Sequence, residues 1–380
     1  MASVKEARAA ALWPAIVFSL ILVGLAPFLG RIRKFLSENL ESGYTLALAL
    51  AFGLAVGVAL ALAIAGIRER RRLRYTFLSV WIMLMVGQLL FWSRSSAKEN
   101  AVERLHFVFY GLVAVLFYRF FRKWREPSAL VVAVLAATMV GIVDEGIQWR
   151  FPLRVADYMD LVVNAYAAFA GLWLAVTVWP LESFSWRLGR LSWSRLSYWS
   201  TALVLLLAVY FHVAHLGHLI EDPELGTFRS LYTVEELERL GPERQALWKE
   251  RPPGRPQDLT ATELEDYYRS EGGWRVLYRD RAERYLDKPY EAWRENLFLE
   301  KYFGPFLDLP DGGGSPFRWS AARRARNEAA QPETAPYPYV SPVGKFPRHS
   351  ILIRPTKTEL WVGVAVVVGM LLLAPRWRRD

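Results

Sequence analysis

Ionisable and amide side chains near the ends of three apolar segments are the residues in this chain whose types and spacing suit chemistry. The first group opens one such segment: Glu103 and His106 are three residues apart, and Tyr110 follows four residues later. Residues at these spacings share one face of a helix. Arg104 belongs to the same group. Charged groups in or near a membrane are costly to desolvate, so each indicates either a function or a specific structural partner.

The second group closes one apolar segment and the third opens the next. In the second group, Asp144 and Gln148 lie one helical turn apart. In the third, residues 157, 160 and 164 are spaced so that they share a helix face. The members of the two groups are Asp144, Glu145, Gln148, Arg154, Asp157, Asp160 and Asn164.

The polar residues suit three kinds of site. They predict a buried hydrogen-bonded network in which Arg154 neutralises Asp157 or Asp160, and His106 pairs with Glu145, because buried charges require partners. Alternatively, they predict a binding site for a lipid headgroup at the outer leaflet. Arg104 and Arg154 would then hold phosphate, while the carboxylates, Gln148 and Asn164 accept hydrogen bonds from sugar or amine groups.

Catalysis is the third interpretation of these residues. Glu145 or His106 would serve as a general base. Alternatively, Glu103, His106, Asp144 and Asp160 would surround a divalent metal ion. None of the apolar segments carries a metal-ligand spacing such as H-E-x-x-H. We therefore do not predict an enzyme.

A separate histidine cluster, His212, His215 and His218, ends another apolar segment. The predicted helix over residues 199–219 carries all three on one face, where one of them would be able to ligate a metal, a haem or a chlorophyll. The simpler interpretation places them near lipid headgroups. We expect no bound cofactor. The chain has no cysteine, which excludes disulfides and thiolate zinc sites.

The elements that carry these residues are predicted to be membrane-spanning helices. The chain is 53% hydrophobic, above the usual range for soluble proteins. Apolar runs of spanning length predict about eight transmembrane helices in an all-α polytopic bundle. They cover residues 11–30, 44–66, 76–93, 105–121, 128–145, 158–179, 199–219 and 359–375.

The basic residues predict the orientation of this bundle. Lys and Arg are roughly twice as frequent in the connections on the side of the two termini as in the others, so both termini are expected in the cytoplasm. The net charge of +10 is then explained by topology and by anionic lipids, and nucleic acid is not an expected partner. All three polar groups should meet near the outer leaflet.

Residues 220–358 are expected to form an inserted, mainly helical extracytoplasmic domain. Capping boxes at Thr233–Glu236 and Thr260–Glu263 predict two helix starts. Pro289 suits a first helical turn. The predicted organisation is a seven-helix membrane region over residues 1–219, this domain, and a last transmembrane helix with a basic tail over residues 359–380.

The order and spacing of the three polar groups resemble the motif series of the VanZ-like membrane family. The resemblance covers residues 103–171, where the motifs E-R-x-H-x-x-x-Y, G-x-x-D-E-x-x-Q and R-x-x-D-x-x-D-x-x-x-N occur in order. It implies a bacterial cell-envelope protein, because the family's namesake is associated with resistance to teicoplanin. The family offers no established catalytic residues to transfer.

These observations lead to one expected function and two alternatives. We expect an integral protein of the bacterial cytoplasmic membrane that binds a lipid or lipid-linked envelope molecule at the outer leaflet. The first alternative is a non-catalytic accessory subunit of a larger membrane complex, and the second is a membrane-embedded enzyme acting on envelope lipids. Membrane lipids, and in the first alternative other subunits, are the expected partners.

Overall fold

The computed structural model divides the chain into two compact units, each described here by itself. Unit 1 comprises Met1–Gln148, Asp157–Tyr210 and Lys357–Asp380, and unit 2 comprises Trp149–Ala156 and Phe211–Thr356. The structure describes residues 12–40, 43–91, 97–151, 158–179, 185–240, 270–284, 286–307, 317–332, 338–344 and 349–377.

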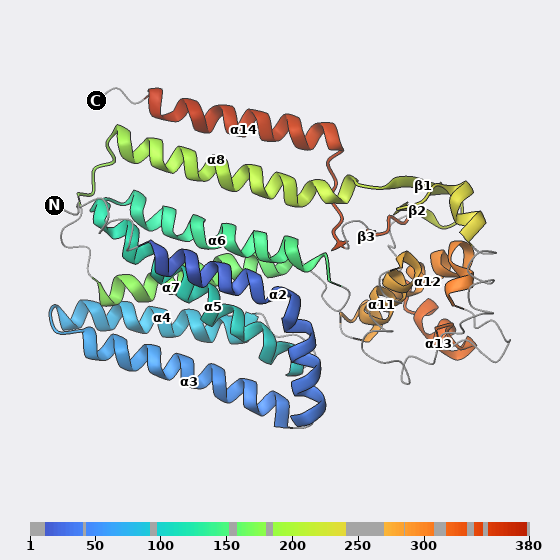
Figure 1. Ribbon diagram of the computed structural model, residues 1–380, viewed down its shortest axis with the longest axis horizontal. Helices are drawn as coiled ribbons and strands as arrows, with labels where there is room; N and C mark the ends of the chain where they lie inside the picture. Colours follow the sequence, from blue (N-terminus) through green and yellow to red (C-terminus); the bar gives the residue numbers. More distant parts are fainter. Residues whose placement is uncertain are drawn as a thin grey trace. The chain divides into compact units, whose positions relative to one another are not determined.

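Unit 1 consists of long helices that run side by side (Figure 1). They are α2 (Trp13–Leu40), α3 (Gly43–Gly66), α4 (Arg71–Phe91), α5 (Ala97–Phe121), α6 (Ser128–Gln148), α7 (Tyr158–Val178), α8 (Arg190–His212) and α14 (Lys357–Trp377). Helix α5 packs against both α6 and α7, α4 packs on α7, and α3 packs on α5. The described members of the three polar groups therefore lie on three helices in mutual contact.

Seven helices in the described part of the chain are long and apolar enough to cross a membrane, namely α3 to α8 and α14. About eight spans were expected, and the difference lies in the first of them. The apolar part of α2 covers Trp13–Leu29, a length at the lower end of the range for a membrane span. The seventh expected span was also misplaced, because α8 begins at Arg190 and ends at His212.

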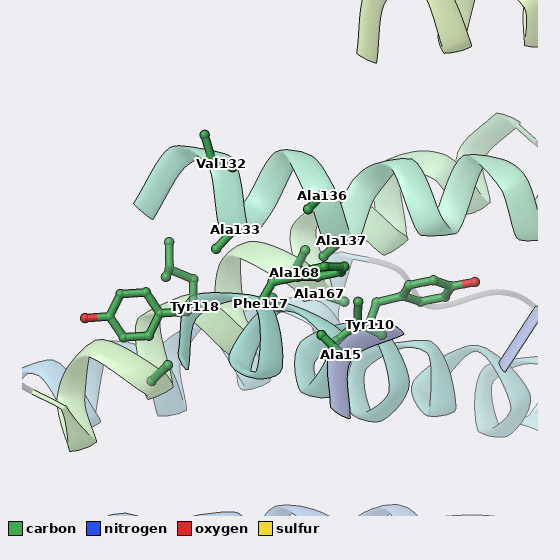
Figure 2. Close-up of a cluster of buried hydrophobic side chains, with 14 of the residues drawn as sticks. Ala15, Tyr110, Phe117, Tyr118, Val132, Ala133, Ala136, Ala137, Ala167 and Ala168 are labelled. Carbon is green, nitrogen blue, oxygen red and sulfur yellow. The ribbon is translucent and has the colours of Figure 1, made fainter. Parts of the chain in front are cut away.

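Small residues bring α5, α6 and α7 close together. A Cβ atom added to Gly171 on α7 would lie 2.2 Å from the carbonyl oxygen of Gly111 on α5, so the two backbones touch at this crossing. Alanines of α6 and α7 fill the adjoining core (Figure 2). Such contacts are typical of helices that associate through close packing within a membrane.

The hydroxyl groups of Tyr110 and Tyr118 point to opposite ends of this packed core (Figure 2). Near the Tyr118 end, the turn between α5 and α6 binds the start of α8. Glu126 accepts hydrogen bonds from Ser192 and Arg195, and the Arg195 guanidinium lies 4.1 Å from the centre of the Trp124 ring. The Tyr110 end carries the polar cluster described below.

Unit 2 combines short helices with two hairpins. Its elements are β1 (His218–Asp222), β2 (Gly226–Ser230), α11 (Glu271–Arg284), α12 (Pro289–Tyr302), α13 (Ala321–Glu328), β3 (Val343–Gly344) and β4 (His349–Ser350). Strands β1 and β2 pair antiparallel, as do β3 and β4. The expectation of a mainly helical domain missed the β1–β2 hairpin, in which buried Ile220 and Phe228 are directly paired.

Two of the predicted helix starts in unit 2 are confirmed. Thr233 and Glu236 exchange backbone-to-side-chain hydrogen bonds of 2.8 and 3.3 Å, which makes a capping box. Pro289 occupies the first turn of α12. The second predicted capping box, Thr260–Glu263, lies outside the described residues.

A buried ion-pair network lies at the centre of unit 2. Arg275 of α11 bonds to Glu271 of the same helix at 3.0 Å and to Glu295 of α12 at 3.4 Å. All three side chains are fully buried, and the Arg275 guanidinium also faces the rings of Phe228 and Phe303. Partners on several sides compensate for the desolvation of these charges.

Candidate functional site

A hydrogen-bonded cluster joins the polar residues of α5, α6 and α7 at one end of the helix core. The Tyr110 hydroxyl donates to Asp144 Oδ2 at 2.7 Å. Gln148 Nε2 donates to the same oxygen at 3.0 Å and to Glu145 Oε1 at 2.9 Å. The helical spacing of three and four residues lets one amide of α6 reach both carboxyl groups. Tyr110 thereby ties α5 to α6.

His106 and Asn164 join α5 to α7 in the same cluster. His106 Nδ1 lies 2.8 Å from Asn164 Oδ1. The imidazole also stacks on the Tyr110 ring with 5.8 Å between the ring centres. Because Asn164 Oδ1 can only accept, we assign the hydrogen to Nδ1. In the neutral ring, Nε2 then carries a lone pair.

Gly141 gives Asn164 the space that it occupies against α6. A Cβ atom on Gly141 would lie 3.0 Å from both Cβ and Nδ2 of Asn164, so a larger residue would crowd the amide. Gly141 is the first residue of the G-x-x-D-E-x-x-Q motif, but no role in the site was predicted for it. Its position one turn before Asp144 was the available signal, since small residues mark close approaches between membrane helices.

The cluster has a buried core and a partly exposed rim. Tyr110, Asp144, Glu145, Gln148 and Asn164 are all 4% exposed or less. In contrast, Arg104, His106 and Asp160 are each half-buried. The buried residues hold one another in place, and the rim residues can be reached by a bound molecule. The arrangement therefore presents an oriented, half-buried imidazole at the edge of a buried hydrogen-bonded core.

The structure brings six of the predicted residues together, namely His106, Tyr110, Asp144, Glu145, Gln148 and Asn164, with one pairing that differs from the expected one. His106 bonds to Asn164 instead of Glu145, because Asn164 on α7 lies opposite His106 whereas Glu145 is engaged by Gln148 of its own helix. The side chain of Glu103, and Arg154 and Asp157 entirely, lie outside the described residues. Their predicted roles, including the phosphate contact of Arg154, stay predictions.

The histidine cluster is not the single helical face that the sequence suggested. Helix α8 ends at His212, and His215 ends a 3-10 turn (Val213–His215). Gly217 then adopts a φ of +90°, which leads the chain into β1, where His218 is exposed. Within the described ranges no group of three His, Cys, Asp or Glu side chains is arranged to hold a metal ion.

Comparisons with known proteins return no match for this chain among protein-family models, curated proteins or solved structures.

Proposed function

We propose that this chain is a multi-pass protein of the bacterial cytoplasmic membrane that binds a lipid or lipid-linked envelope molecule at the outer leaflet. The ligand site is the rim of the polar cluster on α5, α6 and α7. Both termini face the cytoplasm, and residues 220–358 face outward. The seven apolar helices are compatible with this arrangement, and the distribution of basic residues favours the orientation.

The orientation of His106 is the observation that carries the proposal. Its Nδ1 is held by Asn164, and its ring is stacked on Tyr110. The described residues make no hydrogen bond to Nε2. A half-buried imidazole fixed in this way can accept a hydrogen bond from a ligand. Such an acceptor favours a headgroup with amine or hydroxyl donors.

The order of the motifs adds support to the envelope assignment. The residues that resemble the VanZ-like series are those that meet in the cluster: His106 and Tyr110 of the first motif, Asp144, Glu145 and Gln148 of the second, and Asn164 of the third. Three separate sequence motifs that converge in space are better explained by one shared site than by three independent helix contacts.

Lipid-dependent thermal stability tests this proposal. Purified protein in detergent would be titrated with phosphatidylethanolamine or a neutral glycolipid, whose headgroups donate hydrogen bonds. Phosphatidylcholine, whose headgroup has no donor, is the comparison. We expect saturable stabilisation by the donor-bearing lipids, its loss in His106→Gln, and its retention in His218→Gln, which changes an exposed histidine of β1.

Two results would contradict the proposed site. Equal stabilisation by phosphatidylcholine would mean that the headgroup donors are not recognised. Unchanged lipid dependence in His106→Gln, with a lower melting temperature throughout, would make the cluster internal scaffolding.

An accessory subunit of a larger membrane complex is the second candidate. The candidate spans on α3 and α14 are each 6% buried, against 44–50% for those on α5, α6 and α7. Gly53 and Gly57 of α3 also face open space, which suits close approach of another helix. Stoichiometric protein partners in a gently purified sample would favour this candidate over the lipid site.

A further inference from the structure

His349 occupies the point where the connections of unit 2 to three long helices come together. Within unit 2, Trp149 is the first residue after α6, Val213 directly follows α8, and Ile351 lies shortly before α14. All three are buried. We call Trp149, Val213 and Ile351 the stem of unit 2. His349 on β4 contacts each of them.

The contacts of His349 use both ring nitrogens and one ring edge. The backbone N–H of Ile351 donates to His349 Nδ1 at 3.3 Å. A hydrogen bond with the backbone of Val213 raises the pKa of the ring, so the ring donates to a carbonyl there, which leaves Nε2 as the donor. The Trp149 ring meets the imidazole edge-on with 6.3 Å between centres.

Gly344 leaves space for the His349 ring and links it to the core of unit 2. A Cβ atom on Gly344 would lie 2.2 Å from His349 Nε2, so only glycine fits beneath the imidazole. The Gly344 carbonyl accepts a 2.8 Å hydrogen bond from Trp274 Nε1, and Trp274 is fully buried on α11. The stem is thus joined through the β3–β4 hairpin to the centre of the domain.

We infer that His349 is a proton-operated latch: its neutral imidazole holds the stem of unit 2 closed, and protonation in acid opens the stem. A proton on Nδ1 would face the Ile351 N–H, so a donor would meet a donor and that hydrogen bond would be lost. A buried imidazolium would also have to be desolvated.

The surrounding charges oppose protonation as well. Burial is the largest cause that lowers the pKa of His349, to about 4, and the positive charges of Arg275 and Arg229 lower it further. Arg275 comes from α11 and is itself paired with Glu271 and Glu295, while Arg229 comes from β2. Among the described residues, the other neighbours of the ring are an indole and backbone groups, which do not titrate in acid.

The difference between the folded and unfolded pKa values fixes the direction of the effect. An unfolded histidine binds its proton near pH 6.5, whereas His349 in the closed stem does so near pH 4. The open form therefore binds more protons than the closed form between these values. Opening becomes more favourable as the pH falls, by a factor on the order of 100 between pH 7 and pH 4.

The absence of cysteine from the chain allows a clean test. Val213→Cys places a thiol at a stem position that is 7% exposed, and Leu352→Cys places one at a neighbouring position that is 56% exposed. The full chain in lipid nanodiscs would be treated with 4,4′-dithiodipyridine, which reacts with thiols in acid. The reaction rate of Val213→Cys is divided by the reaction rate of Leu352→Cys at each pH. The reagent's own pH dependence affects both rates and cancels, so the ratio reports the opening of the stem.

We expect this ratio to rise on the order of 100-fold from pH 7 to pH 4, and to change little when His349→Gln is added. Glutamine keeps one donor and one acceptor but does not titrate. An equal rise with His349→Gln, or no rise in either protein, would overturn the latch. A rise that disappears in Glu295→Gln would assign the proton to the buried carboxyl and would also overturn it.

A second measurement covers the case in which His349→Gln does not fold. The chain has five histidines, and NMR of the ¹³C-histidine-labelled protein follows each ring during a pH titration. One imidazole that stays neutral until about pH 4 supports the latch. Ordinary titration of all five in the folded protein would overturn it.

Discussion

The two units bury polar side chains in different ways, and the difference predicts which substitutions each one tolerates. In unit 1, Asp144 accepts hydrogen bonds from a phenol and an amide, between helices separated by glycine and alanine. In unit 2, Arg275 lies between two carboxylates and is covered by aromatic rings. The first arrangement depends on small side chains between the helices, and the second depends on an arginine paired with two carboxylates.

The proposed location of unit 1 in a membrane accounts for this contrast. Lipid offers little hydrophobic driving force between helices, so the helices of unit 1 gain stability through close backbone contact. Unit 2 buries large aromatic side chains such as Trp274, Phe298 and Phe303, as water-exposed domains do. Unit 1 should therefore be most sensitive to added volume, and unit 2 to a lost charge.

Removal of the central arginine should have the largest effect. Arg275→Met leaves Glu271 and Glu295 buried without their cation, and we expect it to lower the free energy of unfolding of unit 2 by about 3–5 kcal/mol. Chemical denaturation of the full chain, followed by near-UV circular dichroism, measures the change. Arg284→Met, which alters an exposed arginine of α11, should stay near the wild type. A change in the free energy of unfolding as small as that of Arg284→Met would contradict the view that unit 2 depends on paired charge.

Added volume at the α5–α7 crossing should have the next largest effect. Gly171→Ala places a methyl group 2.2 Å from the Gly111 carbonyl oxygen and should cost about 1–3 kcal/mol through overpacking. Gly53→Ala adds the same methyl group to α3 where it meets nothing. Thermal melts in detergent compare the two variants. If they melt alike, close packing does not hold unit 1 together.

Loss of one hydrogen bond in the polar cluster should have a smaller effect. Tyr110→Phe keeps the ring that stacks on His106 but removes the donor to Asp144, which should cost about 1 kcal/mol or somewhat more. Tyr198→Phe removes a hydroxyl from an exposed tyrosine of α8 and serves as the control in the same melts. Greater stability of Tyr110→Phe than of the wild type would contradict the network.

The smallest predicted effect is an acid-dependent one at the edge of unit 2. Hydrogen bonds from Arg323, Asn327 and Arg326 lower the pKa of Glu283 from 4.5 to about 2, against the opposing effect of its partial burial. The stabilisation is complete above pH 4.5 and is lost as the pH falls toward 2. Solvent screening keeps it modest. Denaturation midpoints across this range should fall less steeply in Glu283→Gln, and identical slopes would rule out a role for this carboxylate.

Sequence patterns predicted the elements of unit 1 better than those of unit 2. The charge-free run of α3 specifies an apolar helix directly, because the hydropathy of a span is a local property. The chain beyond α8 is less predictable, because a 3-10 turn follows His212 and the positive φ of Gly217 then leads into β1. The β1–β2 hairpin was missed for a related reason. Its buried residues alternate, but the segment is only five residues per strand and directly follows an apolar helix.

The composition of the candidate site was predictable, but its pairings were not. Helical spacing correctly grouped Asp144 with Gln148 and His106 with Tyr110, since these pairs lie on single helices. The bond between His106 and Asn164 depends on how α5 and α7 approach one another. That approach is set by Gly111 and Gly171, which are sixty residues apart, so the sequence does not indicate that these two glycines meet.

Native mass spectrometry of protein extracted gently from its host membrane tests the central claim most directly. Our account predicts a defined lipid or lipid-linked molecule bound to a single chain, retained by His218→Gln and lost from His106→Gln. A chain that carries no such molecule, or that keeps it unchanged in His106→Gln, would contradict a ligand site at the rim of the polar cluster.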